Sequence, residues 1–207
     1  MINFNVPPFT GKEMEYIKTA VESQKICGDG QFTKNCNAWI EERTNTAKCL
    51  LTTSCTHATE LAALLAKVQP GDEVITTPIT FAASANCALY CGAKPVFADI
   101  NDKTYNIDPE NVKALTTEKT KAVVAVDFTG QSVELDKLMA HCKENNLVLI
   151  EDGAHVIGTK YKDKPNGSIA DMTTFSFHPV KTVTGGEGGA VMTNNEEYYQ
   201  KLLLARS

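Results

Sequence analysis

The feature that most constrains the fold is an alternation of short apolar runs with longer segments of helical pattern. Continuous apolar runs rich in β-forming residues occupy 48–53, 121–128 and 147–152, and helical segments such as 56–68 and 133–146 separate such runs. Parallel strands need crossover connections, and strands covered on both faces are apolar at nearly every position. The pattern therefore predicts an α/β fold of three layers, α/β/α, around a mostly parallel sheet.

Both ends of the chain depart from this alternation. Near the start, Thr10 and Glu13 have capping-box spacing and open a helix predicted through about Ser23, and a second helix is predicted over 34–43. Toward the end, two strands are predicted with a long glycine-containing loop between them, followed by a helix. The other predicted elements are strands within 70–78, 95–100, 171–177 and 188–194 and helices over 81–91, 108–115 and 196–205.

Composition narrows the class of protein. With 207 residues the chain can bury one sizeable core, and 43% hydrophobic with 22% charged residues is ordinary for a globular protein. A formal charge of −5 argues against a general affinity for nucleic acid, although it is compatible with a local pocket for one anion. No run has the apolar length of a membrane span, and the start lacks the layout of a secretion signal. A cytoplasmic protein is therefore expected.

The cysteines are scattered and form no CxxC pair. An odd number at irregular spacing, with several in apolar runs, favours reduced and buried thiols. A disulfide framework or a zinc site is the less favoured interpretation. The seven positions are Cys27, Cys36, Cys49, Cys55, Cys87, Cys91 and Cys142.

Polar or special residues follow three of the predicted strands at their carboxyl ends. The sequence SCTH at 54–57 follows the first strand, Thr80 and Phe81 follow the second, and Asp152 ends the strand at 147–152. In open α/β sheets, ligands bind outside the carboxyl ends of the strands. The sequence therefore predicts a ligand site at this edge of the sheet.

Lys181 follows the apolar segment FSFHPV and precedes a loop containing GGEGG. A lysine is by default a solvated surface charge, but this lead-in predicts a partly buried position. Burial disfavours the charged form of an amine, and the neutral form is the one that attacks an aldehyde. The glycines would let the backbone approach a ligand closely, or they would simply form a tight turn.

The acidic pair Glu151 and Asp152 has two interpretations. At the end of a buried strand, such a pair is by default a helix cap or a solvated turn. Alternatively, Asp152 has a cationic partner, because a carboxylate against the ring nitrogen of pyridoxal phosphate (PLP) keeps the ring protonated and able to accept electrons. His155 lies one helical turn further on and could reach the same ring, although a lone histidine is more often structural.

Small and hydroxyl residues at 54–57 also have two interpretations. In one, they simply cap the following helix. Free amides, hydroxyl groups and the helix dipole together also form an anion site, to which the Ser176 hydroxyl could contribute. Phe81 is by default a core residue and alternatively an aromatic lid over a planar ring.

Together and in this order, these segments resemble the DegT/DnrJ/EryC1/StrS family of sugar aminotransferases, which are fold-type I PLP-dependent enzymes. The resemblance runs from about Phe4 to the last residue, and its most specific part is the segment around Lys181. It implies the PLP-binding large domain of this fold type and a homodimer, because such sites form between subunits. The matching segments are CGDGQFT, LLTTSCTHATELAALL, PGDEVITTPITFAASANCALYCGAKPVFADI, YNIDPENV, VDFTGQ, EDGAHVIG and SFHPVKTVTGGEGGAVMTN.

The resemblance implies a role for each candidate residue. Lys181 would form the Schiff base with PLP and then shuttle protons between the cofactor and the substrate carbon. Asp152 would pair with the pyridinium nitrogen, His155 would lie near the ring hydroxyl, and Phe81 would stack on the ring. Gly153 stands where alanine is common, which is expected to be harmless. The residues around the phosphate would be Ser54, Cys55, Thr56, the backbone amide of His57, and Ser176.

The implied reaction moves an amino group from L-glutamate to a nucleotide-linked 4-keto-6-deoxyhexose. Residues 7–36 and the SCT junction look like dTDP-4-amino-4,6-dideoxygalactose transaminases. In contrast, TTPITFAASAN, VDFTGQSVELDKL and SFHPVKTVTGGEGG look more like UDP-linked 4-aminotransferases of the pseudaminic acid route. The nucleotide therefore stays open between dTDP and UDP. Lys181 argues against the relatives that carry histidine there and act as dehydratases.

The expected domain organisation is an N-terminal arm and helix at 1–30 and a PLP-binding large domain at 31–207. The family's smaller C-terminal domain, which carries residues for the substrate, is expected to be absent. An alternative function is therefore a truncated relative that binds PLP or a nucleotide sugar without turnover. A nicotinamide-binding Rossmann domain is set aside, because TTSCTHATEL lacks the GxGxxG pattern at the first strand-to-helix turn.

Overall fold

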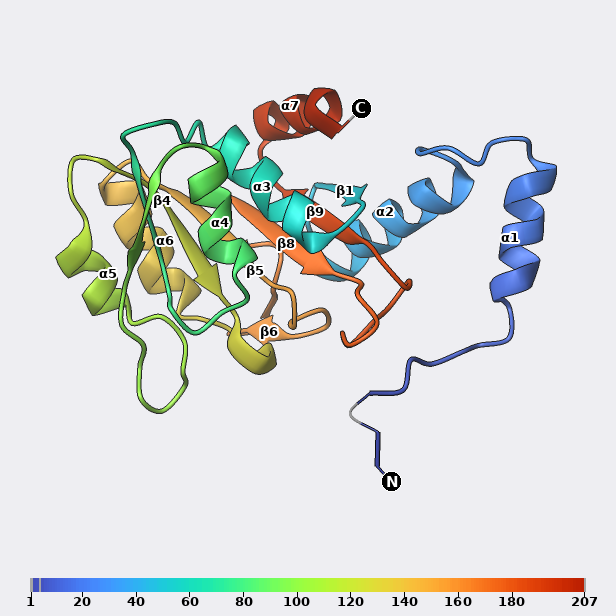
Figure 1. The fold of residues 1–207 in the computed structure, drawn as a ribbon, viewed down its shortest axis with the longest axis horizontal. Helices are drawn as coiled ribbons and strands as arrows, with labels where there is room; N and C mark the ends of the chain where they lie inside the picture. Colours follow the sequence, from blue (N-terminus) through green and yellow to red (C-terminus); the bar gives the residue numbers. More distant parts are fainter. Residues whose placement is uncertain (1, 4, 207) are drawn as a thin grey trace.

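Figure 1 shows the computed structural model of the chain, which describes residues 2–3 and 5–206. Phe4 and Ser207, the two limits of the resemblance, lie outside the described residues. Within the described part, seven strands form one sheet in the order β1-β9-β8-β5-β4-β2-β3. They are β1 (Lys48–Thr52), β2 (Glu73–Thr76), β3 (Lys94–Phe97), β4 (Thr120–Val126), β5 (Val148–Asp152), β8 (Met172–Ser176) and β9 (Gly189–Thr193).

The sheet is mostly parallel, as predicted. Strands β8, β5, β4, β2 and β3 pair in parallel along the sheet. Only β9 among these seven strands runs antiparallel to its neighbours, β1 and β8, so that β1 points the same way as the parallel strands. The carboxyl ends of β1, β5 and β8 therefore meet at one edge of the sheet.

Helices cover both faces of the sheet, which confirms the three-layer α/β/α architecture (Figure 1). One face is covered by α3 (Cys55–Leu65), α4 (Ala83–Tyr90) and α7 (Glu196–Arg206). The other face is covered by α2 (Gln31–Thr44), α5 (Pro109–Leu115) and α6 (Leu135–Glu144).

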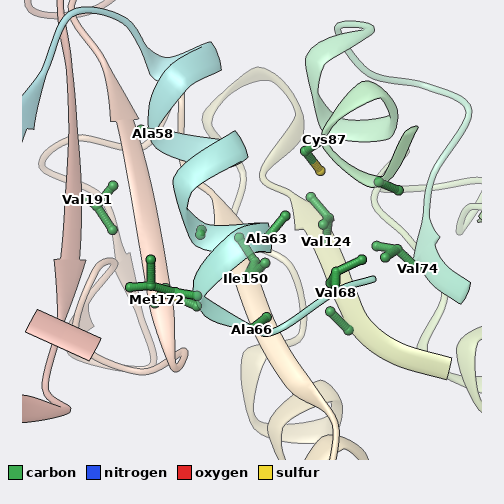
Figure 2. Packing of buried hydrophobic residues seen from close by; sticks show 14 of the residues in the cluster. Ala58, Ala63, Ala66, Val68, Val74, Cys87, Val124, Ile150, Met172 and Val191 are labelled. Carbon is green, nitrogen blue, oxygen red and sulfur yellow. The ribbon is translucent and has the colours of Figure 1, made fainter. Parts of the chain in front are cut away.

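Alternating side chains of the central strands enter different layers of the core. In β4, Val124 packs in one cluster with Ala63 of α3 and Cys87 of α4 (Figure 2), whereas Val123 packs in another with Leu138 of α6. All of these residues are fully buried. Because successive side chains of a strand point to opposite faces, a strand between two helical layers must be apolar throughout.

A glycine sets the distance between β9 and the turn that joins β1 to α3. A Cβ atom at Gly189 would lie 2.5 Å from the backbone nitrogen of Cys55 and 2.5 Å from the carbonyl carbon of Ser54. Only a residue without a side chain permits this approach. The close approach brings the glycine-containing loop before β9 beside the SCTH turn.

Helix α1 (Glu13–Glu22) buries none of its residues and lies apart from the sheet in Figure 1. The predicted contact between Thr10 and Glu13 forms, because the Glu13 carboxylate accepts from the backbone N–H of Thr10 at 2.6 Å. The helix nevertheless begins at Glu13 and not directly after Thr10. Gly11 has φ +85°, a left-handed conformation that interrupts the helical path.

Some short elements were not predicted. A hairpin of β6 (Lys160–Tyr161) and β7 (Lys164–Pro165) lies in a segment without apolar periodicity. A 3₁₀ turn, η1 (Phe128–Gly130), begins within the run predicted as a strand over 121–128, because β4 ends at Val126. Helix α2 begins at Gln31, three residues before its predicted start. Hairpins of two-residue strands carry too little pattern to be recognised from sequence.

The cysteines are all free in the structure, but their environments differ from the expectation. Cys49, Cys87 and Cys142 are buried, whereas Cys27 and Cys36 are exposed. The two exposed residues lie before and within α2, outside the apolar runs that suggested burial. Among the helices that the described residues form, none has the length and apolarity needed to cross a bilayer.

Candidate active site

A cavity of about 280 Å³ opens at the edge where the carboxyl ends of β1, β5 and β8 meet. Its walls come from the β1–α3 turn, the segment after β2, the end of β5 and the loop between β8 and β9. Two of the nine predicted site residues, His57 and His155, are not part of its lining. The other seven line it: Ser54, Cys55, Thr56, Phe81, Asp152, Ser176 and Lys181.

Lys181 is half-buried, and its amine meets an imidazole. Its Nζ lies 2.7 Å from Nε2 of His155. His155 does not line the cavity, and it is connected to the site by this contact with Lys181. Burial lowers the pKa of His155, and the positive charge of Lys181 lowers it further. The imidazole is therefore favoured in its neutral form, in which a ring nitrogen can accept a hydrogen bond from the amine.

Asp152 lies at the end of β5 and is 6% exposed. Its Oδ2 accepts a hydrogen bond from Ser84 Oγ at 2.7 Å, and its Oδ1 accepts a weaker one from the backbone N–H of Ala154 at 3.3 Å. No lysine, arginine or histidine among residues 2–3 and 5–206 forms an ion pair with it. A buried carboxyl group without an ionic partner beside a cavity fits a cationic group of a ligand.

The β1–α3 turn presents the N-terminus of α3 to the cavity. Ser54 caps the helix, since its side chain accepts from the backbone N–H of His57 at 3.1 Å. Cys55 and Thr56 occupy the first turn, where backbone N–H groups have no partner within the helix. Ser176, at the end of β8, lines the same cavity. Unpaired amides and hydroxyl groups at a helix N-terminus fit an anion such as phosphate.

His57 lies away from the cavity. The amide expected to face a phosphate is used in the cap of α3, and the imidazole Nδ1 lies 2.5 Å from Thr53 Oγ1. Its side chain lines a separate pocket that includes Arg206. The reason is geometric: in the first turn of a helix, residues three positions apart share a face, so the capping hydroxyl takes this amide.

Phe81 lies at the rim of the cavity with 75% of its surface exposed. The interpretation as a core residue is therefore wrong, and an aromatic ring at the mouth of a cavity remains free to stack on a planar ligand.

Two residues that sequence reasoning missed also contribute to this site. Ser84, in the first turn of α4, is fully buried and donates to Asp152. Glu187, within GGEGG, lines the cavity and lies 3.8 Å from His178. No local signal singled out Ser84, because it is one of several small residues in the segment FAASANCALYC.

Glu151 does not lie in a solvated turn, as the default interpretation held. It is fully buried on the face of β5 opposite Asp152, and it accepts hydrogen bonds from Asn166 Nδ2 and Thr173 Oγ1, both at 2.6 Å. Asp127 lies in the same cluster, with Asn166 Nδ2 at 3.5 Å from its Oδ2. Burial raises the pKa of Asp127 well above its usual range, and the nearby charge of Glu151 raises it further.

The fold and its relatives define the class of protein. The mostly parallel sheet with helices on both faces is shared with structural neighbours that are fold-type I PLP-dependent aminotransferases. Residues 8–207 match the DegT/DnrJ/EryC1/StrS aminotransferase family. The chain belongs to this family.

Individual relatives are similar along nearly the whole chain. The spore coat polysaccharide biosynthesis protein SpsC of Bacillus subtilis (strain 168) is 44% identical over 202 residues, covering 96% of this chain and 51% of that protein. A GDP-perosamine synthase of Caulobacter vibrioides is 34% identical over 99% of this chain and 55% of its own length. The structure of Helicobacter pylori PseC, an aminotransferase involved in the biosynthesis of pseudoaminic acid, has a TM-score of 0.90 at 33% identity, covering 99% of this chain and 55% of that one. The chain thus spans about half the length of the curated relatives it matches.

Proposed function

We propose that this chain is the cofactor-binding part of a PLP-dependent sugar aminotransferase and that Lys181 binds the cofactor covalently. The observation that carries the proposal is the position of the Lys181 amine, half-buried at the cavity and 2.7 Å from a histidine whose pKa is lowered. Bound PLP would act as the electron sink for the carbon from which the amino group leaves. The remaining chemistry is positioning and proton transfer, which belong to the residues of the chain.

Three groups of residues would hold the cofactor. Asp152 would pair with the ring nitrogen, because its carboxyl group is buried and has no ionic partner among the described residues. Phe81 would cover the ring from the rim of the cavity. The phosphate would be bound at the N-terminus of α3 by Ser54, Cys55, Thr56 and Ser176.

The proton-transfer role would fall to Lys181. Its Nζ would take a proton from the substrate carbon and deliver one to the cofactor carbon on the other side of the shared nitrogen, as a general base and acid. His155 Nε2 is close enough to accept a hydrogen bond from this amine and hold it in place. A neutral imidazole can accept a hydrogen bond from the amine and does not repel its positive charge. The lowered pKa of His155 therefore favours this arrangement.

The proposal is tested by titrating the purified chain with PLP and following the visible absorption of lysine-bound cofactor. We expect a band in the wild type that is lost in Lys181→Ala. Lys103→Ala is the matched control, because Lys103 is exposed and does not line the cavity. Bands of equal strength in the wild type and in Lys181→Ala would contradict the assignment of this lysine.

We propose L-glutamate as the amino donor and a nucleotide-linked 4-keto-6-deoxyhexose as the acceptor, in cell-surface polysaccharide or amino-sugar biosynthesis. The resemblance suggests a dTDP or UDP sugar, and the similarity to a GDP-perosamine synthase adds GDP to the nucleotides worth testing. Glutamate should bleach the visible band of the PLP-loaded chain if the first half-reaction proceeds. A stable band after glutamate would favour the alternative function, a relative that binds PLP without turnover.

We also propose that the protein is a cytoplasmic homodimer in which residues 31–207 form the PLP-binding unit and residues 1–30 an arm. The exposed helix α1 supports a separate arm. The arm also reaches the site, since Asn5 Nδ2 donates to the carbonyl of Pro179 at 3.0 Å, two residues before Lys181. Sedimentation of the PLP-loaded chain tests whether it is a dimer. The same measurement on the chain without residues 1–30 tests whether residues 31–207 form the PLP-binding unit by themselves.

A further inference from the structure

The carboxyl group of Asp152 accepts a hydrogen bond from a buried serine, which in turn contacts a threonine. Ser84 Oγ lies 2.7 Å from Asp152 Oδ2, and Thr80 Oγ1 lies 2.7 Å from Ser84 Oγ. Ser84 is fully buried, and the Sγ of Cys55 lies 4.0 Å from the other carboxylate oxygen, Oδ1. These side chains come from α4, the segment before it, and α3.

The direction of the hydrogen bonds can be worked out from the donors available. A serine hydroxyl has one proton, and if it is donated to Asp152, the Ser84 oxygen must accept from Thr80. The thiol of Cys55 also keeps its proton, because burial raises its pKa to about 12. Ser84 therefore presents its proton to Asp152, and Thr80 supports it by donating to the Ser84 oxygen. The Cys55 thiol lies nearer to Thr174 Oγ1, at 3.7 Å, than to Asp152, at 4.0 Å, so its contact with the carboxylate is secondary. A donor at 2.7 Å suits a carboxylate oxygen, which accepts.

The backbone before α4 also links these hydroxyl groups to Phe81, whose ring lies at the rim of the cavity. The Ser84 backbone N–H donates to the carbonyl of Phe81 at 3.1 Å, and Thr80 Oγ1 lies 3.3 Å from that carbonyl. A displacement of Ser84 would therefore affect both the carboxylate and the ring. Preorganised donors of this kind need no rearrangement when a ligand binds.

We propose that Ser84, supported by Thr80, is a positioning residue that holds the Asp152 carboxylate oriented toward the ring nitrogen of the cofactor. The inference rests on the proposed function, because it assigns Ser84 a part in PLP binding. Ser84 acts through Asp152 and makes no contact with the cofactor itself.

The first test measures the hydrogen bond in the free protein by a double-mutant cycle. Ser84→Ala, Asp152→Ala and the double variant are unfolded in urea. A hydrogen bond to a charged group predicts a coupling of about tenfold in the unfolding equilibrium constant. A coupling below about twofold would overturn the proposal, because Ser84 and Asp152 would then act independently.

The second test measures the dissociation constant of PLP from its visible band. We expect about tenfold weaker binding in Ser84→Ala and recovery in Ser84→Thr, which restores the hydroxyl donor. Thr76→Val is the matched control, since Thr76 is buried and its hydroxyl has no partner among the described residues.

Three outcomes separate this inference from the proposed function. Unchanged PLP affinity in Ser84→Ala, with a normal band in the wild type, would overturn the inference alone. Equal losses in Ser84→Ala and Thr76→Val would also overturn it, because the effect would then be one of general packing. A wild-type chain without a band would overturn the proposed function and with it the part of Ser84 in PLP binding.

Discussion

Replacing Gly189 by alanine tests how the cavity is built. The new Cβ would lie 2.5 Å from Cys55 N, 2.5 Å from the carbonyl carbon of Ser54 and 2.6 Å from its oxygen. Ordinary contacts between such atoms are about 3.5 Å or longer, so the two segments must separate by about 1 Å. All three atoms belong to the backbone, and no flexible side chain can give way.

The expected cost is at the upper end of the range for overpacked sites, about 3 kcal/mol in the free energy of unfolding. At a typical urea dependence of about 2 kcal/mol/M, the midpoint of unfolding should fall by about 1.5 M. The folded variant should also bind PLP more weakly, because the displaced turn carries Ser54 and Cys55.

The assay compares Gly189→Ala with Gly28→Ala in urea unfolding and PLP titration. A Cβ at Gly28 meets no atom within 4 Å, so that variant should behave like the wild type. If Gly189→Ala unfolds at the same urea concentration as Gly28→Ala and binds PLP equally well, the close approach of β9 to the α3 turn is not needed for this site.

Two other predictions concern the residues around β5. The raised pKa of Asp127 means that the folded chain keeps a proton that the unfolded chain loses at about pH 4, so stability should fall as pH rises above that value. Asp127→Asn mimics the protonated carboxyl group and should flatten this dependence in urea unfolding between pH 4 and neutrality; an unchanged slope would contradict the prediction. Gly153→Ala would place its Cβ 2.9 Å from Val156 Cγ2 and 3.1 Å from the Thr174 carbonyl oxygen, so it should lower Tm at a cost of about 1 kcal/mol. A rise in Tm would show that the site relaxes freely, in line with the usual benefit of replacing glycine by alanine.

Most of the sheet could be predicted because its strands are buried on both faces. The run at 121–128 is apolar almost without interruption, and this pattern follows directly from the two helical layers that pack on β4. The edge of the sheet that carries the site was predictable for the same reason. Strands that run the same way bring their carboxyl ends to one edge, so the residues after β1 and β5 were expected at the same edge, although two strands, β9 and β8, separate β1 from β5.

The rest depended on tertiary contacts that local sequence does not encode. Ser84 looked like one small residue of an apolar helix, and only the packing of α4 against β5 reveals its bond to Asp152. The burial of Glu151 depends on Asn166 and Thr173, which lie 15 and 22 residues further along the chain. Sequence left residues 54–57 open between a helix cap and an anion site, and only the structure shows that the Ser54 side chain accepts from the His57 amide.

The central claim is that Lys181 binds PLP covalently, and chemical trapping tests it most directly. The PLP-loaded chain is reduced with borohydride, digested, and searched by mass spectrometry for the modified peptide. The account predicts that the phosphopyridoxyl group lies on a peptide that contains the segment SFHPVK and is attached to Lys181. Modification spread over exposed lysines such as Lys103, with Lys181 unmodified, would contradict it.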